Sequence, residues 1–223
     1  MKRPKLRLPK KIRVVIVEDH PMFRERLGQL IAKSDDMMVA GEADNIRDGF
    51  ALIQRVEPSV AIIDVSLKGS SGLELLKNLR AHQIDVPVLV LSMHDESLYA
   101  ERAMRAGARG YITKHEASRT VMAAIRHVLK GQIYLNPRFL SQLMDRVLSG
   151  RSPSARPIDL LADRELEVFE LIGRGLTTQE IGAQLHLGAT TVDTYKARIK
   201  EKLDLQNAAR LRVEASRWVQ ERE

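Results

Sequence analysis

Short apolar runs alternate with helix-like segments through the first half of the chain. The apolar runs lie at 14–17, 38–40, 60–63, 88–91 and 111–112, and the segments with helical periodicity at about 21–33, 46–55, 72–81, 96–106 and 118–130. The runs are continuous rather than alternating with polar residues, as expected of strands buried on both faces. Five strand–helix units in this order predict an α/β domain built on a doubly wound, five-stranded parallel sheet.

The pattern changes after Gly131. One more helix is predicted over 137–148, and the following Ser-, Pro- and Arg-rich segment, 149–157, has the composition of a linker. Beyond it only helical periodicity remains, with helices expected at 163–173, 178–185, 190–203 and 207–220. We therefore expect three parts: an α/β domain over 12–131, a connecting helix and linker over 132–157, and a small all-α domain over 158–223.

Length and composition narrow the class of protein. A chain of 223 residues suits two domains, and the absence of cysteine excludes disulfides, thiolate metal sites and a cysteine nucleophile. No apolar run approaches the roughly 18 residues of a membrane span. The basic N-terminus lacks the apolar stretch of a signal peptide. A cytoplasmic protein with no membrane partner is the expectation.

The net charge of +7 is concentrated outside the predicted domains. The first 13 residues carry seven basic residues and no acid, a charge of +7, and residues 134–157 carry four basic residues and one acid, a charge of +3. The two predicted domains are slightly acidic: residues 14–133 carry 15 basic and 16 acidic residues (−1), and residues 158–223 carry ten basic and 12 acidic residues (−2). Overall charge is thus no argument that the C-terminal part binds DNA. The basic tail either adds salt-sensitive affinity for DNA phosphates or has no role.

Three carboxylates follow two of the predicted strands. Glu18 and Asp19 come directly after the first strand, and Asp64 comes directly after the third. These strands are neighbours in the usual winding, so the three side chains should converge at the carboxyl edge of the sheet. Carboxylates that close need a cation or a proton between them, and oxygen ligands of this kind suit magnesium. Taken singly, an aspartate at a strand end is more often a turn former or helix cap.

The other strand ends supply complementary groups. Ser92 follows the fourth strand and offers a hydroxyl, and Lys114 follows the fifth and offers a cation for a phosphoryl oxygen. Aspartate is a known acceptor of phosphoryl groups. The set predicts that Asp64 is a phosphorylation site.

Residues 12–131 resemble a bacterial response-regulator receiver domain. The resemblance is carried by VVIVEDHPMFRERL at 14–27, AIIDVSLKGSSGLELL at 61–76, VLVLSMHD at 88–95 and GARGYITK at 107–114. It implies a flavodoxin-like fold, a phosphoacceptor at Asp64, and a site for magnesium or manganese. The ion would be held by Glu18, Asp19, Asp64 and the carbonyl of Ser66, with Ser92, Tyr111 and Lys114 as the switch and phosphoryl-stabilising residues.

Two positions depart from the receiver pattern. Lys68 and His115 stand where the family often has proline, and neither change removes a reacting group. The six histidines show no metal-ligand spacing, so we expect each to be a surface or packing residue.

The segment 176–203 is typical of a helix–turn–helix. Thr177 to Glu180 matches a capping box, and Leu187-Gly188 supplies a turn. The core side of the second helix is predicted to consist of Val192, Tyr195 or the stem of Lys196, Ile199 and Leu203. Four basic residues and one acid fall within 196–202. A helix of this kind suits the major groove, and an ordinary solvated helix is the alternative.

Residues 158–219 resemble the LuxR-type helix–turn–helix of the NarL/FixJ response regulators. The matching pieces are DRELEVFELIGRGLTTQEIG and TTVDTYKARIKEKLDLQN. The resemblance implies contacts to double-stranded DNA, and the candidate residues are Thr177, Thr190, Thr191, Asp193, Thr194, Lys196, Ala197, Arg198 and Lys200.

Two further expectations concern the helices on either side of this motif. Ala162 stands where a Ser or Thr cap is usual, unless Asp163 caps the helix by a one-residue shift. The last helix resembles a dimer-forming helix through Leu211, Ala215, Trp218 and Val219, and simple packing onto the domain core is the alternative.

Three functions compete. The first is a two-component transcription factor phosphorylated on Asp64 by a histidine kinase and dimeric when active. The second is a DNA-binding regulator that does not need phosphorylation and uses the first domain for protein interaction. The third, an aspartate-nucleophile phosphatase, is disfavoured because Ser66 stands where that class has its general acid. The chain is accordingly not expected to be an enzyme.

Overall fold

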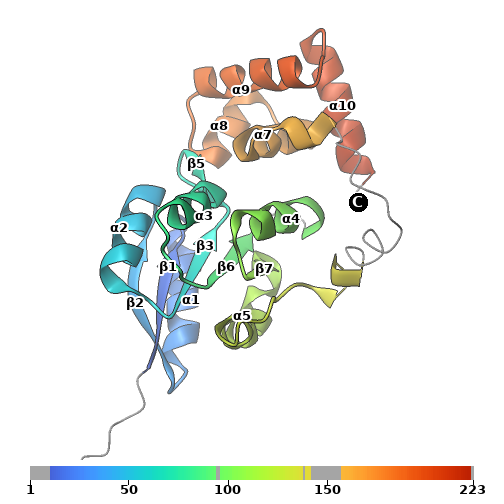
Figure 1. Cartoon of the computed structure of the whole chain (residues 1–223). Coiled ribbons are helices and arrows are strands. Elements are labelled where there is room, and N and C mark those ends of the chain that lie inside the picture. The colour runs from blue at the N-terminus through green and yellow to red at the C-terminus, as the bar shows by residue number, and fades with distance from the viewer. Residues whose placement is uncertain (1–10, 94–95, 138, 142–156, 222–223) are drawn as a thin grey trace, which may run out of the picture. The chain divides into compact units, whose positions relative to one another are not determined.

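The computed structural model describes residues 11–93, 96–137, 139–141 and 157–221. Leaving aside residues 68–71, the chain divides into two compact units, the first ending at Phe139 and the second beginning at Leu140 (Figure 1). The basic N-terminal tail, the linker and most of the helix predicted over 137–148 lie outside the described residues.

The first unit is built on a parallel sheet of five strands. These are β1 (Ile12–Val17), β2 (Met37–Ala43), β3 (Val60–Asp64), β6 (Val88–Ser92) and β7 (Gly110–Thr113). Their order is β2-β1-β3-β6-β7, the doubly wound arrangement predicted from the sequence. The pair β4 (Ser66–Leu67) and β5 (Ser70–Ser71) was not predicted, because strands of two residues leave no periodic signal.

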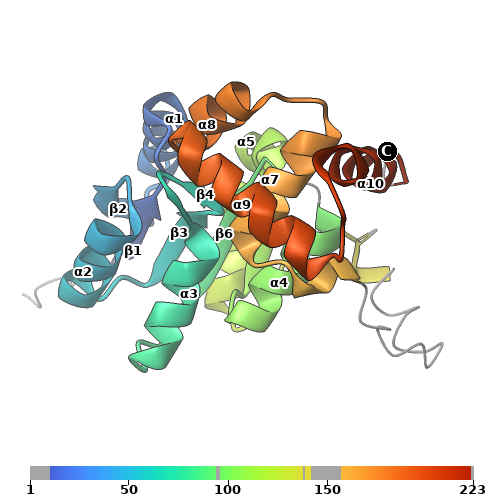
Figure 2. The same ribbon diagram turned by 90° about the horizontal axis from the view of Figure 1, so that it is seen from above.

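Helices cover both faces of this sheet. They are α1 (Pro21–Ala32), α2 (Ile46–Val56), α3 (Gly72–Ala81), α4 (Glu96–Ala106) and α5 (Lys114–Leu129). Helices α1 and α5 lie together on one face, and α2, α3 and α4 lie on the other (Figure 2). Strand residues such as Val14, Ile62 and Leu89 are fully buried between the two layers, which explains the continuous apolar runs.

Helix α5 starts four residues earlier than predicted. The sequence pattern placed its start at 118, whereas it begins at Lys114, with Thr113 as its N-cap. The first turn contains Glu116, an acid that suits a helix N-terminus, but its core-facing pattern starts only at Ala117. Periodicity therefore could not detect this turn. The correction matters because it makes Lys114 the first residue of a helix rather than part of a loop.

The second unit is helical. A short 3₁₀ turn, η1 (Pro157–Leu160), precedes α7 (Asp163–Gly173), α8 (Thr178–Leu185), α9 (Ala189–Lys202) and α10 (Ala208–Gln220). Each of these four helices agrees with its predicted range to within one residue at either end. Among the described residues, no helix is both long and apolar enough to cross a membrane.

Candidate metal centre and nucleic-acid interface

Three acidic side chains meet at the carboxyl edge of the sheet. Glu18 and Asp19 follow β1, Asp64 ends β3, and these strands are paired with Val17 opposite Ile63. The residues are only 1%, 5% and 1% exposed, respectively. Ligand atoms of the three carboxylates and of His20 all lie within 4.8 Å of one another. The predicted convergence of the carboxylates is confirmed.

Lys114 bridges two of these carboxylates. Its Nζ donates to Asp64 Oδ2 at 2.7 Å and to Glu18 Oε1 at 2.9 Å, and it lies 4.9 Å from the centre of the Phe23 ring. Burial acts to lower the pKa of Lys114, but the charges of Asp64 and Glu18 outweigh it and raise that pKa. The lysine is therefore held as a buried ammonium.

Asp64 itself is electrostatically strained. Burial raises its pKa well above the ordinary value, and the nearby charge of Glu18 raises it further, although Lys114 acts in the opposite direction. Three carboxyl groups therefore share one buried ammonium. The donor set is oxygen-rich and buried, so the residues fit a divalent cation.

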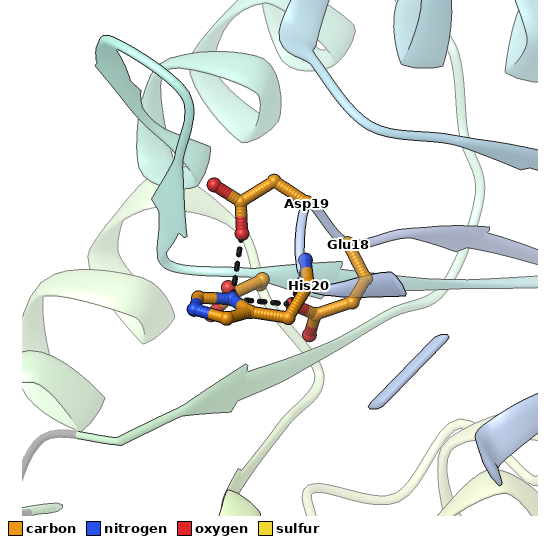
Figure 3. Close-up of side chains that lie close together, drawn as sticks. Glu18, Asp19 and His20 are labelled. Atoms are coloured by element: carbon orange, nitrogen blue, oxygen red, sulfur yellow. Dashed lines mark hydrogen bonds and ion pairs between the residues drawn. The ribbon is translucent and has the colours of Figure 1, made fainter. Parts of the chain in front are cut away.

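His20 was not predicted as part of this cluster. Its Nδ1 lies 2.8 Å from Asp19 Oδ1 and 3.1 Å from Glu18 Oε1 (Figure 3). Its side chain is 55% exposed, as expected of a surface histidine, but it also lies against the acidic pair, which the spacing between histidines could not indicate. The signal that could have found it is its position directly after the acidic pair.

The remaining predicted residues occupy the same edge or its strands. The Ser66 amide donates to Asp64 Oδ1 at 3.3 Å. Ser92 ends β6 and is fully buried, and Tyr111 is fully buried on β7 opposite Val90. Ser92 and Lys114 thus lie at the carboxyl ends of the adjacent strands β6 and β7, and Tyr111 lies two residues before the end of β7.

Gly72 allows the chain to pass close behind Asp64. Its amide donates to the carbonyl of Val65 at 2.6 Å, and a Cβ added at this position would lie 1.8 Å from the Asp64 carbonyl oxygen. Any side chain here would push the α3 N-terminus away from β3. The glycine therefore fixes the shape of the loop that follows the central carboxylate.

In the second unit, α8 and α9 form the predicted helix–turn–helix. Glu180 Oε2 accepts from the Thr177 amide at 2.8 Å, and the Glu180 amide donates to Thr177 Oγ1 at 3.3 Å, which confirms the capping box. Leu187 and Gly188 lie in the turn as predicted, and His186 before them takes the left-handed conformation. Gly182 is needed instead for contact, since a Cβ there would lie 2.7 Å from the Leu187 carbonyl oxygen.

Helix α9 has one buried and one exposed face. Val192 and Ile199 are buried, and Tyr195, Lys196 and Leu203 are partly buried. Lys200 is also partly buried, and the other predicted DNA contacts in and near α9 are exposed: Thr177, Thr190, Thr191, Asp193, Thr194, Ala197 and Arg198.

Lys196 is tied to its own domain. Its Nζ donates to Thr178 Oγ1 and lies 3.8 Å from Asp193 Oδ1. These contacts link the start of α8 to α9, so this ammonium is less available to a ligand than the exposed guanidinium of Arg198.

Comparison with known proteins identifies both units. Residues 14–126 match the family "Response regulator receiver domain", and residues 159–215 match "Bacterial regulatory proteins, luxR family". This chain belongs to the response regulators. It is a two-component regulator that combines a receiver domain with a LuxR-type DNA-binding domain, as the sequence predicted.

Individual relatives span almost the whole response regulator. Response regulator GacA of Pseudomonas aeruginosa is 33% identical over 92% of this chain and 96% of its own length. The probable transcriptional regulatory protein NarL of Mycobacterium tuberculosis is 31% identical over 94% of this chain and 95% of its own.

Solved structures share the fold. A two-component response regulator of the LuxR family from Aurantimonas sp. SI85-9A1 is 27% identical, with a TM-score of 0.58 over 62% of this chain and 99% of that one. RcsB from Salmonella enterica serovar Typhimurium, bound to promoter rprA in the presence of phosphomimetic BeF3-, is 21% identical, with a TM-score of 0.58 over 93% of this chain and 99% of that one.

The first helix of the response regulator's DNA-binding domain lacks a side-chain cap. Ala162 is the N-cap of α7, so the alternative in which Asp163 takes over the cap is wrong. Glu165 Oε2 accepts from the Ala162 amide at 2.8 Å and from Lys202 Nζ at 2.7 Å. Half of a capping box is therefore present, and it also ties α7 to the end of α9.

The proposed dimer face of α10 is used within the domain. Leu211 and Ala215 are buried, Trp218 meets Phe169 of α7 edge-on with ring centroids 5.7 Å apart, and Val219 lies against Gly173. The packing alternative therefore describes these four residues. Trp218 and Val219 remain partly exposed, and among the described residues of α10 Val213 is the exposed large apolar side chain.

Proposed function

We propose that this response regulator accepts a phosphoryl group on Asp64 from a histidine kinase and then acts on specific promoter DNA as a homodimer in the cytoplasm. The observation that carries the proposal is the buried Asp64 carboxylate, bonded at 2.7 Å to Lys114 and placed beside Glu18 and Asp19. This is a nucleophile with a cation and a metal-ion site next to it.

The phosphoryl step is a transfer between two residues. An Asp64 carboxylate oxygen attacks phosphorus, the phosphorus–nitrogen bond to the kinase histidine breaks, and an acyl phosphate forms. Glu18, Asp19, Asp64 and the Ser66 carbonyl would hold magnesium or manganese, which supplies charge stabilisation for the phosphoryl oxygens when bound. Lys114 donates to the phosphoryl oxygens as a second source of positive charge.

The added group changes the balance at the sheet edge. It contributes about −1.5 to −2 charge and strong acceptor oxygens, toward which Ser92 and Lys114 can move. Lys114 then exchanges its contact with Glu18 for one with the phosphoryl group. We expect Tyr111, which is fully buried on β7, to follow Ser92, so that phosphorylation shifts a population between two packings of α4 and β7.

The DNA-binding part of the proposal rests on the exposed face of α9. Thr194, Ala197 and Arg198 are directed to solvent, as a helix in a major groove requires. Threonines 177, 190 and 191 stand at helix starts, where hydroxyl and amide groups suit phosphate oxygens. Because the exposed face of α9 carries an acid at Asp193 and a small side chain at Ala197, we expect its preference for DNA bases to be its own.

The proposal is tested with a small-molecule phosphodonor. The full chain, Asp64→Ala and a control with an exposed loop aspartate removed, Asp85→Ala, are incubated with acetyl phosphate and Mg²⁺. Intact mass and sedimentation are then measured. We expect one added phosphoryl group and a shift toward dimer in the wild type and in Asp85→Ala, and neither in Asp64→Ala.

The opposite result has a defined meaning. If neither acetyl phosphate nor any candidate kinase phosphorylates the wild type, Asp64 is not a phosphoacceptor. The second candidate function, DNA binding without phosphorylation, would then be favoured, provided that the untreated chain binds promoter DNA with the affinity of the treated one.

A further inference from the structure

We infer that His20 is a nitrogen ligand of the divalent-ion site and gives this response regulator a preference for first-row transition ions such as Mn²⁺ or Co²⁺ over Mg²⁺. The inference rests on the metal site of the proposed function and adds a ligand to it. It concerns a residue that the acidic set does not include.

The position of the imidazole is the first reason. His20 Nδ1 lies 2.8 Å from Asp19 Oδ1 and 3.1 Å from Glu18 Oε1 (Figure 3). Neighbouring ligand atoms around a six-coordinate ion with bonds of about 2.1 Å are about 3.0 Å apart. Each of the two distances from Nδ1 therefore matches the spacing of neighbouring ligand atoms in a coordination shell. Without an ion, the same contacts are hydrogen bonds or ion pairs from the ring to the acids.

The backbone holds the ring in this place. The His20 amide donates to Glu18 Oε1 at 3.0 Å, and His20 is the N-cap of α1, followed by Pro21 in the first helical position. Proline restricts the residue before it to extended backbone, which keeps the His20 Cβ next to the acidic pair. The contacts from the ring to Asp19 and Glu18 then select this rotamer.

The exposure of the ring fits a ligand at the mouth of a site. Glu18 and Asp64 are 1% exposed, whereas the His20 side chain is 55% exposed. A buried floor of carboxylates with a half-exposed imidazole at the rim leaves the solvent side open, where a phosphoryl oxygen or water can complete the coordination.

The chemistry of the ligand sets the metal preference. Magnesium takes oxygen ligands almost exclusively and gives up its waters reluctantly, whereas imidazole binds manganese and later ions increasingly well along the first row. Replacing an oxygen or a water by Nδ1 should therefore favour Mn²⁺ and Co²⁺ relative to Mg²⁺. The preference should disappear with the imidazole.

The test measures binding and nitrogen coordination directly. Calorimetric titrations of the metal-free full chain with Mg²⁺, Mn²⁺ and Co²⁺ are compared for the wild type, His20→Asn, and His82→Asn, which removes an exposed imidazole of the α3 end. Pulsed electron paramagnetic resonance on the Mn²⁺ form reports a directly bound ¹⁴N. We expect nitrogen coupling in the wild type and His82→Asn only, and at least a roughly tenfold loss of Mn²⁺ and Co²⁺ affinity in His20→Asn with little change for Mg²⁺.

Two results would overturn the inference in different ways. If the ions bind the wild type without nitrogen coupling, and bind His20→Asn equally well, the metal site of the proposed function stands but His20 is not one of its ligands. No binding of any ion, to the wild type or the variants, would remove both.

Discussion

At the scale of one residue, the negative charge of Asp64 lies where it lowers the stability of the folded state. The carboxylate is buried, lies next to Glu18, and is offset by the single ammonium of Lys114. Burial and the second carboxylate raise its pKa, so ionised Asp64 costs folding free energy that a bound cation would return. A carboxylate in this environment is expected at a site that receives a phosphoryl group, whereas a residue that only supported the fold would be more favourable if it were uncharged.

This strain predicts a pH-dependent gain in stability for Asp64→Asn. Because the folded-state pKa is raised, the contribution of Asp64 to the free energy of unfolding is present below its ordinary pKa of 3.8 and lost as the pH rises through the folded-state value. In metal-free buffer at pH 7 the variant should be more stable by about 1 kcal/mol, and the difference should shrink toward pH 4. Calorimetric unfolding at several pH values measures it.

Added Mg²⁺ is the control for this prediction. Binding to the folded state should raise the melting temperature of the wild type and leave Asp64→Asn nearly unchanged. A variant that is less stable than the wild type at neutral pH, by an amount that does not vary with pH, would contradict the account.

Gly72 gives a second prediction at the residue scale. The Cβ of Gly72→Ala would lie 1.8 Å from the Asp64 carbonyl oxygen, and since this neighbour is backbone, it cannot move aside cheaply. We expect a loss of about 3 kcal/mol and slower phosphorylation by acetyl phosphate. Gly69 is the matched control, because its φ is +70° but nothing lies within 4 Å of an added Cβ. Gly69→Ala should cost only about 1 to 2 kcal/mol, and a larger loss there than at Gly72 would refute the steric argument.

At the scale of elements, the helices differ in how well their ends are satisfied. Helix α8 begins with a complete capping box at Thr177 and Glu180, and the hydrogen bond from the Thr177 backbone lowers the pKa of Glu180. Helix α7 has only the half supplied by Glu165. Its N-terminus therefore relies on the link from Glu165 to Lys202 of α9.

Restoring the missing cap should stabilise the DNA-binding domain. Ala162→Ser adds an oxygen at the N-cap, where it can accept from the backbone amide of Glu165, and caps of this kind contribute about 1 kcal/mol. The change should appear as a higher denaturation midpoint in the fluorescence of Trp218, which packs on α7. Ala183→Ser, on the exposed side of α8, is the control and should be neutral or slightly destabilising. Equal effects at the two sites would argue against a cap.

At the scale of the whole molecule, the two units carry separate features, a buried cluster of carboxylates in one and a helix–turn–helix in the other. Activation by dimer formation needs a surface that the domain core does not already use. On α10, Leu211 and Ala215 are buried, whereas Val213 is 57% exposed. The helix thus has an apolar residue available to a second copy of the chain.

This distinction predicts opposite outcomes for two substitutions in one helix. Val213→Arg should leave the unfolding midpoint nearly unchanged and weaken dimers formed after acetyl phosphate treatment, or assembled on DNA, by about tenfold or more. Leu211→Ala should destabilise the domain by about 2 to 5 kcal/mol, because it opens a cavity between α10 and α7. Sedimentation and denaturation measure the two effects. Dimers of undiminished strength in Val213→Arg would exclude this part of α10 as the contact.

The sequence by itself determined the order of elements and the core of the candidate site. Strands buried on both faces leave continuous apolar runs, and Glu18, Asp19, Asp64 and Ser92 could be assigned because carboxyl ends of parallel strands share one edge. The helix–turn–helix could be predicted equally well, because its caps and its apolar stripe are local signals within a few turns of chain.

Only the tertiary structure decided which side chains meet. The place of His20 over the acidic pair depends on the turn between β1 and α1, and the ion pairs of Lys114 depend on where α5 starts relative to β3. The apolar stripe of α10 suits a dimer and a domain core equally well, because both bury the same kind of surface. Contacts between residues far apart in the chain settle these choices, and a one-dimensional pattern does not contain them.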